Sequence, residues 1–444
     1  MKSPRVALGD TVFAEPGSTL DALYRRVNWR LLPFLLLCYV MASLDRINIS
    51  FAKLQMQPAL GMSDAVYGLG AGVFFLGYML FEVPSNLMLG RVGARKTISR
   101  IMILWGITSS CMLFVHDARS FYFLRFLLGV FEAGFAPGMI LYLTFWYSDA
   151  RRARVMAIVL MGGPLAGLIG GPLASMVMNT FNGAHGLAGW QWLFLCEGVP
   201  SVLLGVLTLA YLDDTPKHAN WLTDGDRAVL AEHIRATETG TRHHAFSAAL
   251  KDPRAYAMAF SYFCLICGIY TVSFWLPTML KAAGVSNTVL GWYAAVPYLA
   301  VLLLVPWLAR HSDRTRERRL HSALPVLAGA ALVLLAPLVE HSVAGTLAVM
   351  SAAAVCIYLG YAVFWSIPTG YLKGTAAAGG IALINSIGLL GGFLSPSLIG
   401  WLKSTTGSMQ SGLFVMAAIL LAGGVSILLN RLPVGQRVEA LNDV

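Results

Sequence analysis

Long apolar runs, separated by short polar stretches, follow one another from about residue 30 to residue 430. Each run is close to the ~20 residues that an α-helix needs to cross the hydrocarbon core of a bilayer. The pattern therefore predicts an all-α membrane protein with twelve transmembrane helices and polar tails at 1–28 and 432–444. The expected spans are 30–53, 65–89, 94–116, 119–146, 152–178, 190–212, 254–281, 288–310, 320–340, 343–367, 373–402 and 408–430.

A long polar stretch, 213–252, divides the predicted spans into two groups of six, 29–212 and 253–431. The segment that begins at Trp221 carries apolar residues at helical spacing. This spacing predicts a short amphipathic helix on the membrane surface. The chain is therefore expected to consist of two six-helix halves joined by a central polar loop.

The two halves share a basic tight loop at the same position. The first is Gly90-Arg-Val-Gly-Ala-Arg95-Lys96, and the second runs from Ser312 to Arg319 and contains Asp313 and Arg314. An internal repeat of this kind is typical of secondary transporters. The alternative is that both loops are ordinary cytoplasmic loops enriched in Lys and Arg.

Composition and charge agree with this picture. The chain is 57% hydrophobic and 12% charged, whereas soluble domains average about 25% charged residues. A net charge of +10 would indicate nucleic acid in a soluble protein, but here it comes from loops on one side of the membrane. If both termini are cytoplasmic, most Lys and Arg residues fall in cytoplasmic segments. The exceptions are Lys53, Arg119, Lys281 and Lys403 in external loops, and Arg46 and Arg125 within the membrane. This bias predicts cytoplasmic termini, an inner-membrane location and no nucleic-acid partner.

A few ionisable residues lie inside the predicted spans, where a charge is costly unless it faces a cavity or a partner. They are Asp45, Arg46, Glu82, Arg125, Glu132 and Glu197. Arg125 and Glu132 fall on nearly one helix face, about two turns apart. Arg46 and Arg125 lie at similar depth, each about 9–10 Å from the outer end of its helix. Two guanidiniums at one level suit a carboxylate ligand, because each offers a planar fork of donors.

Proton transfer is expected to involve carboxyl groups, because no histidine lies deep in a span. We predict Asp45 and Glu132 as the proton-coupling residues. Without substrate they balance the arginines; when an anion binds, burial favours the neutral carboxyl, and protonation frees the arginines. The structural alternative is that Arg125 and Glu132 only brace their helices and that Asp45 holds a backbone or gate contact. Glu82 is expected to be structural, linked to a basic loop through Arg95 or Arg151.

The second half has no comparable charges in its spans. Its polar and aromatic side chains are more often packing residues or interface anchors than ligands. We nevertheless predict that the binding site is completed by Tyr270, Tyr298, Ser366 and Asn385. No metal-ligand spacing, nucleotide-binding glycine loop or catalytic grouping is present in the sequence, so neither an enzyme nor a bound cofactor is expected.

Four stretches resemble the anion:cation symporter family of the major facilitator superfamily. They are Leu44-Asp-Arg-Ile-Asn-Ile-Ser-Phe-Ala52, Phe81-Glu-Val-Pro-Ser-Asn86, Arg125-x6-Glu132-Ala-Gly-Phe and Phe274-Trp-Leu-Pro277. The resemblance covers about residues 28–432. It implies the major facilitator fold, with the first and fourth helices beside a central cavity and Tyr78 lining it. It also implies that Arg91, Arg95, Lys96, Asp313 and Arg314 belong to gating loops.

Two positions depart from the family pattern. Relatives usually have an Asp where this chain has Gly90, so the first basic loop lacks its own acidic partner. Relatives often have an Asn where this chain has Leu389, so the choice of substrate can differ.

The expected function is import of a small organic anion with protons, driven by the proton gradient. The anion would be a carboxylate such as tartrate, a sugar acid or an aromatic acid, and the protein a monomer in the bilayer. A carboxylate exchanger would use the same arginines. A cation efflux pump is disfavoured because the arginines repel cations, and a membrane sensor is disfavoured because the chain has no large soluble domain.

Overall fold

The computed structural model describes residues 16–237, 252–371 and 375–430. These residues contain twelve helical spans long and apolar enough to cross a membrane. The prediction of an all-α membrane protein with twelve spans is therefore confirmed. The first span is longer than expected, because it runs from Leu20 to Ala59 and includes part of the predicted N-terminal tail.

Nine α-helices form the N-terminal half. Three of the expected spans are broken, the first at Asn48, the fourth after Glu132 and the fifth at Met161, so each consists of two helices. The helices are α1 (Pro16–Ile47), α2 (Ile49–Ala59), α3 (Asp64–Val92), α4 (Ala94–Cys111), α5 (Ala118–Glu132), α6 (Phe135–Thr144), α7 (Asp149–Leu160), α8 (Gly162–Thr180) and α9 (Gly189–Tyr211).

The C-terminal half follows a loop that carries α10 (Asp224–Thr237), at the place where the sequence predicts an amphipathic helix. Residues 238–251 of that loop lie outside the described part. The helices of this half are α12 (Pro253–Ala282), α13 (Asn287–Thr315), α14 (Arg319–Leu335), α15 (Val343–Phe364), α16 (Ser366–Tyr371), α17 (Thr375–Thr406) and α18 (Gln410–Leu429). Four 3₁₀ turns are η1 (Met112–Phe114), η2 (Ala184–Gly186), η3 (Pro216–His218) and η4 (Ala336–Val339).

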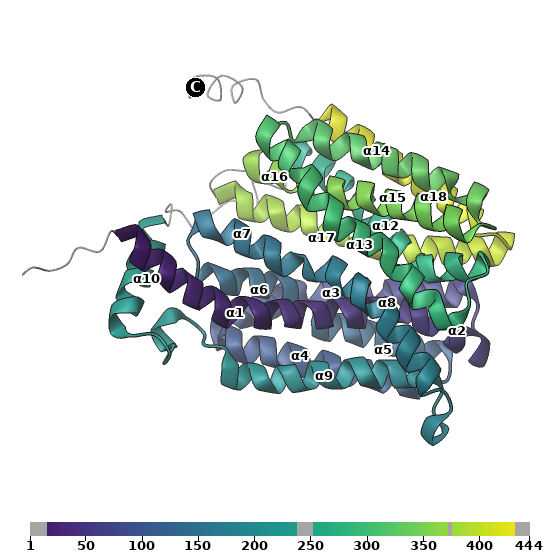
Figure 1. Ribbon diagram of the computed structural model, residues 1–444, viewed down its shortest axis with the longest axis horizontal. Helices are drawn as coiled ribbons and strands as arrows, with labels where there is room; N and C mark the ends of the chain where they lie inside the picture. The colour runs from purple at the N-terminus through teal and green to yellow at the C-terminus, as the bar shows by residue number, and fades with distance from the viewer. Residues whose placement is uncertain (1–15, 238–251, 372–374, 431–444) are drawn as a thin grey trace, which may run out of the picture.

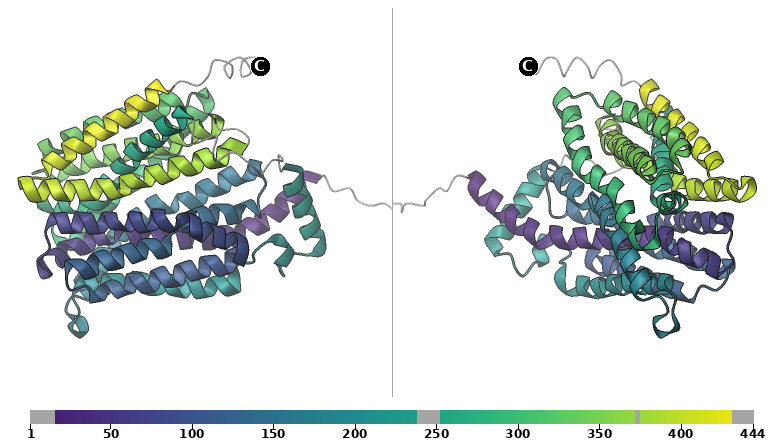
Figure 2. Two further views of the ribbon diagram at one scale, coloured as in Figure 1. Left: turned by 180° about the vertical axis from the view of Figure 1, so that it is seen from behind. Right: turned by 45° about the vertical axis from the view of Figure 1, so that its right-hand side comes forward.

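The two halves form two layers whose helices run side by side (Figures 1 and 2). They meet along α3 against α17 and along α8 against α13. Glycines allow the close approach of α8 to α13, because a Cβ on Gly171 would lie 2.4 Å from the Gly291 carbonyl oxygen. The binding site expected between the halves must therefore lie along these seams.

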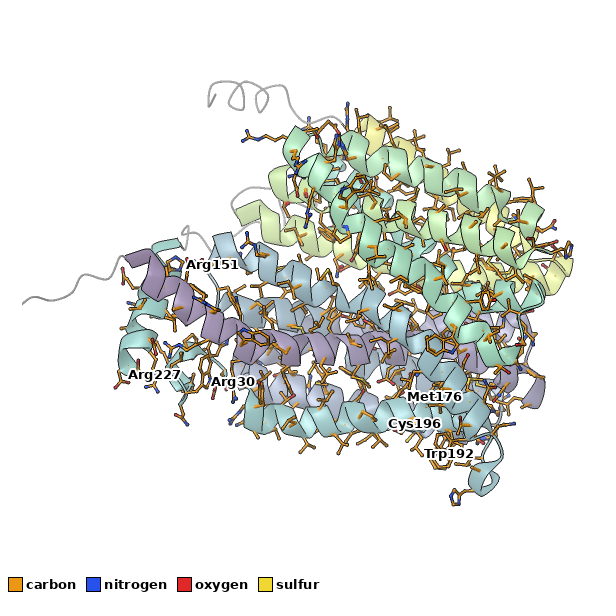
Figure 3. The ribbon with its side chains drawn as sticks, viewed as in Figure 1. Arg30, Arg151, Met176, Trp192, Cys196 and Arg227 are labelled. Atoms are coloured by element: carbon orange, nitrogen blue, oxygen red, sulfur yellow. The ribbon has the colours of Figure 1, made fainter. Side chains whose placement is uncertain are left out.

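We call the end of the bundle where α1 begins and α10 lies the proximal end, and the opposite end the distal end (Figure 1). Basic side chains gather at the proximal end, where Figure 3 labels Arg30, Arg151 and Arg227. Arg151 pairs with Asp21 at 2.5 Å, and Arg26 of α1 pairs with Asp226 of α10 at 2.7 Å. The central loop is thus attached to the N-terminal half.

Contacts between the halves close the distal end. Asp64 of α3 pairs with Lys53 of α2 at 2.7 Å and with Lys403 of α17 at 3.0 Å. Lys53 also lies 4.0 Å from the Trp275 ring centroid and donates to the Thr278 hydroxyl at 3.3 Å. The sequence places Lys53 in an external loop; the structure instead buries its side chain at 2% exposure, because α2 continues the first span.

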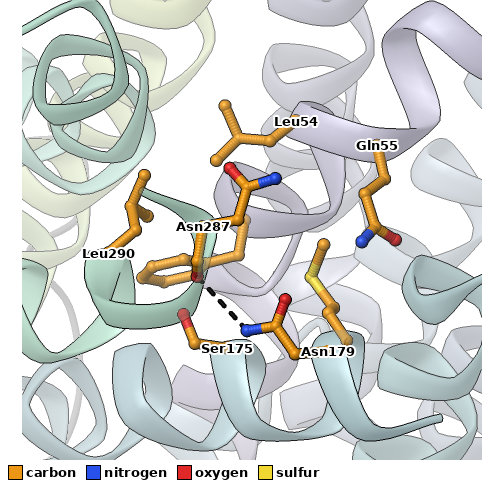
Figure 4. A pocket seen from close by; sticks show the side chains of 8 residues that line it. Leu54, Gln55, Ser175, Asn179, Asn287 and Leu290 are labelled. Carbon is orange, nitrogen blue, oxygen red and sulfur yellow. Dashed lines mark hydrogen bonds between the residues drawn. The ribbon is translucent and has the colours of Figure 1, made fainter. Parts of the chain in front are cut away.

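A small pocket lies beside this closure, between α2, α8 and α13 (Figure 4). At its wall the Asn179 side-chain amide donates to the backbone carbonyl of Asn287 at 3.3 Å. Nearby, the Ser175 hydroxyl accepts from the Gly291 N–H at 2.9 Å. Both contacts join the two halves, so the pocket belongs to the distal closure.

Candidate functional site

Arg46, in the last turn of α1, is the centre of a polar cluster between the halves. Its guanidinium forms an ion pair with Glu132 of α5 and donates to the Tyr270 hydroxyl of α12 at 3.2 Å. The guanidinium carbon lies 5.3 Å from the ring centroid of Phe74 and 5.6 Å from that of Tyr78, both on α3. We call these five residues the Arg46 cluster.

The cluster joins the two halves through one side chain. Arg46 and Glu132 come from the N-terminal half and Tyr270 from the C-terminal half. The Arg46 side chain keeps 21% exposure, whereas Glu132 is fully buried. An arginine whose side chain is partly exposed and whose guanidinium is shared by two protein groups can exchange one of them for a ligand carboxylate, because both offer oxygen acceptors.

Glu132 is the last residue of α5, and the helix is interrupted directly after it. Gly134 has φ of +84°, and a Cβ there would lie 2.6 Å from the Ser85 hydroxyl of α3. The sequence predicts one helix over 119–146, which is wrong at this point because the close packing on α3 requires a glycine in a left-handed conformation. A carboxylate at a helix C-terminus is disfavoured by the helix dipole, so Glu132 depends on Arg46 for its charge balance.

The start of α5 is well defined, and this positions Glu132 and Arg125. Asp117 and Ser120 form a capping box, in which the Ser120 N–H donates to the Asp117 carboxylate at 2.7 Å. Hydrogen bonds from Ser120 hold the pKa of Asp117 below its usual range. The cap satisfies orphan donors of the first turn and sets the helix register.

Arg125 is fully buried beside the Arg46 cluster. It donates to the α3 carbonyls of Gly70 at 3.3 Å and Ala71 at 3.4 Å, and no described residue is a hydrogen-bond partner of its Nη1. Its guanidinium carbon lies 5.2 Å from the Phe74 ring centroid, so both arginines contact the same ring. The structure thus brings Arg46 and Arg125 together but pairs Glu132 with Arg46 alone.

Asp45 points away from Arg46, although the two are neighbours in sequence. Its carboxylate accepts hydrogen bonds from Trp105 at 2.9 Å, Ser109 at 2.6 Å and Ser201 at 2.7 Å. These donors belong to α4 and α9, and Asp45 is fully buried between them. The structure therefore does not place this predicted proton-coupling residue in the Arg46 cluster.

The four site residues predicted in the second half occupy different places. Tyr270 belongs to the Arg46 cluster. Tyr298 is buried, donates to the Ser273 hydroxyl at 3.3 Å and packs at the position where Gly167 of α8 comes close. Ser366 is exposed at the start of α16 and makes no hydrogen bond with the Arg46 cluster.

Asn385 of α17 donates to the Glu82 carboxylate of α3 at 3.0 Å. The sequence predicts that Glu82 contacts Arg95 or Arg151, which is wrong. Arg151 is paired with Asp21 at 2.5 Å. No ion pair joins Glu82 to Arg95 in the described residues, because α17 covers this face of α3.

The predicted gating loops lie at the proximal end. Arg91, Lys96 and Arg314 are exposed there, and Asp313 forms an ion pair with Arg318. The Asp214 carboxylate, from the loop after α9, accepts from the Arg95 backbone N–H at 2.8 Å. Asp214 thus supplies an acid at the start of α4, where the Gly90 loop has none of its own, and the sequence analysis missed it because it is distant in the chain.

Two further residues were missed for lack of a local signal. Phe74 separates and contacts both arginines, but its sequence context is that of any apolar span. Lys403 ends α17 and reaches Asp64 of the other half, a contact between positions more than 300 residues apart that no sequence spacing indicates.

Twelve helical spans in two layers of six spans each, with a charged cluster at their seam, define a multi-pass membrane protein built of two halves. The family model described as Major Facilitator Superfamily matches residues 35–396 and, in a second match, 258–442. The chain belongs to the major facilitator superfamily, which confirms the resemblance seen in its motifs.

Relatives with known names match over most of their length. A protein of Agrobacterium vitis, assigned to tartrate transport by its name alone, is 47% identical over 94% of each chain. The metabolite transport protein NicT of Pseudomonas putida is 43% identical over 94% of this chain and 96% of its own. A quinolone resistance transporter of Acinetobacter baumannii is 40% identical over 90% of this chain and 92% of its own.

The fold is also found among solved structures. A bacterial homologue of the human lysosomal transporter Spinster superposes with a TM-score of 0.73 over 92% of this chain and 97% of that chain. The sequence identity is 16%, so the likeness concerns the fold.

Proposed function

We propose that this protein carries a small organic anion together with protons, by alternating exposure of a site at the Arg46 cluster. The observation that carries the proposal is the sharing of one guanidinium by Glu132 and by Tyr270 of the opposite half. A ligand carboxylate competes with Glu132 for Arg46. The name of the Agrobacterium vitis relative makes tartrate the first ligand to test.

Proton coupling follows from this competition. When Glu132 is ionised it holds Arg46, and an anion must displace it. When Glu132 is protonated the ion pair is lost and Arg46 is free for the anion, so proton and anion favour each other's binding. The second acceptor atom of Glu132, Oε2, is buried and finds no hydrogen-bond partner in the part of the chain that the structure describes.

Arg125 and Asp45 have supporting parts in this proposal. Arg125 adds positive charge beside Phe74 while its own donors face the α3 backbone. Asp45 remains a second candidate for the proton, held by its three donors. The proximal end is assigned to the cytoplasm of a cell with an energised inner membrane, because the basic loops lie there.

The test is Glu132→Gln in purified protein and in proteoliposomes. Wild type should bind tartrate more weakly as the pH rises, since ionised Glu132 then holds Arg46. The Gln variant should show a thermal shift with tartrate that is nearly independent of pH, and proton-driven accumulation should fall about tenfold or more.

Glu197→Gln is the matched control, because Glu197 is equally buried but lies on α9, outside the Arg46 cluster. Accumulation by Glu132→Gln at the wild-type level would remove Glu132 from the coupling mechanism. Sugar acids and aromatic acids are screened beside tartrate, with Arg46→Ala as the variant that should bind none of them.

A carboxylate exchanger is the alternative that uses the same cluster. It would show counterflow of tartrate without a pH gradient and no net accumulation when a gradient is imposed. Under this alternative, Glu132→Gln would exchange tartrate at the wild-type rate, and the rate would not depend on the proton gradient in either protein.

A further inference from the structure

Glu82 is a buried carboxyl at the seam of the two halves for which the mechanism above has no use. It lies on α3, one helical turn beyond Tyr78 in the proximal direction, and is 7% exposed. One oxygen accepts from the Asn385 amide of α17 at 3.0 Å. The other, Oε2, is buried and has no hydrogen-bond partner among the described residues.

No cation balances this carboxyl among the described residues. Arg100 of α4 donates to the Ser85 hydroxyl at 3.1 Å. Arg46 of α1 is paired with Glu132, a buried carboxyl on the neighbouring helix α5. Lys53 and Lys403, on α2 and α17, lie at the distal end with Asp64.

A buried carboxylate with one neutral donor and no counter-ion is expensive in an apolar environment. The neutral acid avoids most of this cost, because it removes the charge and needs no ion-pair partner. The isolated carboxyl of Glu82 therefore suits a group that holds a proton while α3 and α17 are in contact. An ordinary structural link between the helices would be served equally well by glutamine.

The position of Glu82 relates it to the Arg46 cluster. Tyr78 contacts Arg46 through its ring, at 5.6 Å, and Glu82 follows Tyr78 by four residues on the same face of α3. Glu82 thus lies one helical turn from the ring contact between Tyr78 and Arg46, toward the proximal end. Its hydrogen-bond donor belongs to the other half, so the contact exists only while the halves meet at this level.

We propose that Glu82 is a second proton-binding carboxyl on the transport path, and that its burial against α17 makes its protonation depend on contact between the halves. The inference rests on the proposed proton-coupled transport. A proton that leaves the Glu132 carboxyl is taken up by the Glu82 carboxylate. It is released to water at the proximal end when α3 and α17 separate, because water then stabilises the ionised carboxyl.

Two substitutions separate this role from a structural one. Glu82→Gln keeps the volume and the acceptor for Asn385 but cannot carry a proton. Glu82→Asp keeps the acid but shortens the reach to Asn385. A proton carrier predicts loss of proton-driven tartrate accumulation, by about tenfold, in the Gln variant and its retention in the Asp variant. A structural hydrogen bond predicts the opposite order.

The measurements are tartrate accumulation in proteoliposomes under an imposed pH gradient, tartrate counterflow without one, and the thermal shift with tartrate. Glu82→Gln should keep counterflow and thermal shift within about twofold of wild type. Glu197 is also a buried carboxyl whose Oε2 has no partner among the described residues, but it lies on α9, so Glu197→Gln should accumulate tartrate like wild type.

Accumulation by Glu82→Gln at the wild-type level overturns the inference and leaves the proposed function intact. If wild type itself accumulates neither tartrate, a sugar acid nor an aromatic acid on a proton gradient, proton-coupled transport is wrong and the inference falls with it. If Glu82→Gln does not fold, Glu82→Asp decides: accumulation supports the proton role, and its loss overturns it.

Discussion

The side chains of Asp45 and Arg46 point to different neighbours, because the directions of successive side chains on a helix differ by about 100°. Arg46 reaches the seam between the halves and contacts Glu132 and Tyr270. Asp45 reaches the interior of the N-terminal half and accepts three hydrogen bonds. At the scale of single residues, the arginine at the seam is thus separated from a carboxylate that links α1 to α4 and α9.

Asp45→Ala is expected to destabilise the protein. The substitution leaves the Trp105, Ser109 and Ser201 donors buried without their acceptor, and each such group costs about 1–3 kcal/mol. The thermal unfolding midpoint in detergent should fall by several degrees, and Asp45→Asn, which keeps an acceptor oxygen, should recover part of the loss. An unchanged midpoint in Asp45→Ala would show that these hydrogen bonds contribute no net stability.

At the scale of elements, the crossing of α3 and α5 positions the cluster. A Cβ on Gly129 of α5 would lie 1.9 Å from the Phe74 carbonyl oxygen, and one on Gly77 of α3 would lie 2.4 Å from the Phe126 carbonyl oxygen. The two helices therefore touch backbone to backbone. This contact sets the distance from Phe74 and Tyr78 to Arg125 and Glu132, since small residues permit the closest helix packing.

Gly129→Ala is expected to push α5 away from α3 and to move Glu132 relative to Arg46. Tartrate binding, read as the thermal shift, should weaken about tenfold or more, because a displacement near 1 Å is large for a site of this kind. Gly90→Ala is the matched control on α3, where a new Cβ meets nothing within 4 Å. Equal binding by both variants would contradict the packing argument.

At the scale of the whole molecule, the described contacts hold the halves together at the distal end. Asp64 is shared by Lys53 of its own half and Lys403 of the other. The Tyr67 hydroxyl also donates to the Phe274 carbonyl at 3.1 Å across the seam. Opening this end requires breaking a partly buried ion pair, so the charge on Lys403 stabilises the closed arrangement.

Lys403→Ala is expected to favour separation of the halves at the distal end. Losing one partner of a partly buried pair shifts the balance by about 1 kcal/mol or more. Spin labels on the distal ends of the two halves should report a larger population of long distances. Lys281→Ala, an exposed lysine of the same end with no ion pair among the described residues, should leave the distribution unchanged. If the distance distribution of Lys403→Ala matches that of wild type, the ion pair between Lys403 and Asp64 does not help to keep the distal end closed.

Several features could be predicted from the sequence because they are local. Hydrophobic run length determines the twelve spans, since each segment must satisfy its own backbone hydrogen bonds in the bilayer. The rarity of charged residues in those spans singles out Arg46, Arg125, Glu132 and Glu82, because an intramembrane charge is costly wherever it lies. The family motifs around these residues were sufficient for the superfamily assignment.

The partners of those charges were decided only by tertiary structure. Helical periodicity gives the direction of a side chain on its own helix, but it contains no information about which helix packs on that face. The break after Glu132 depends on the close approach of Ser85 of α3. Glu82 is paired with Asn385 of α17, and Lys53 is buried against Trp275 of the other half. The sequence by itself therefore determined which groups require a partner in the membrane, and the packing of two separate halves decided which partner each receives.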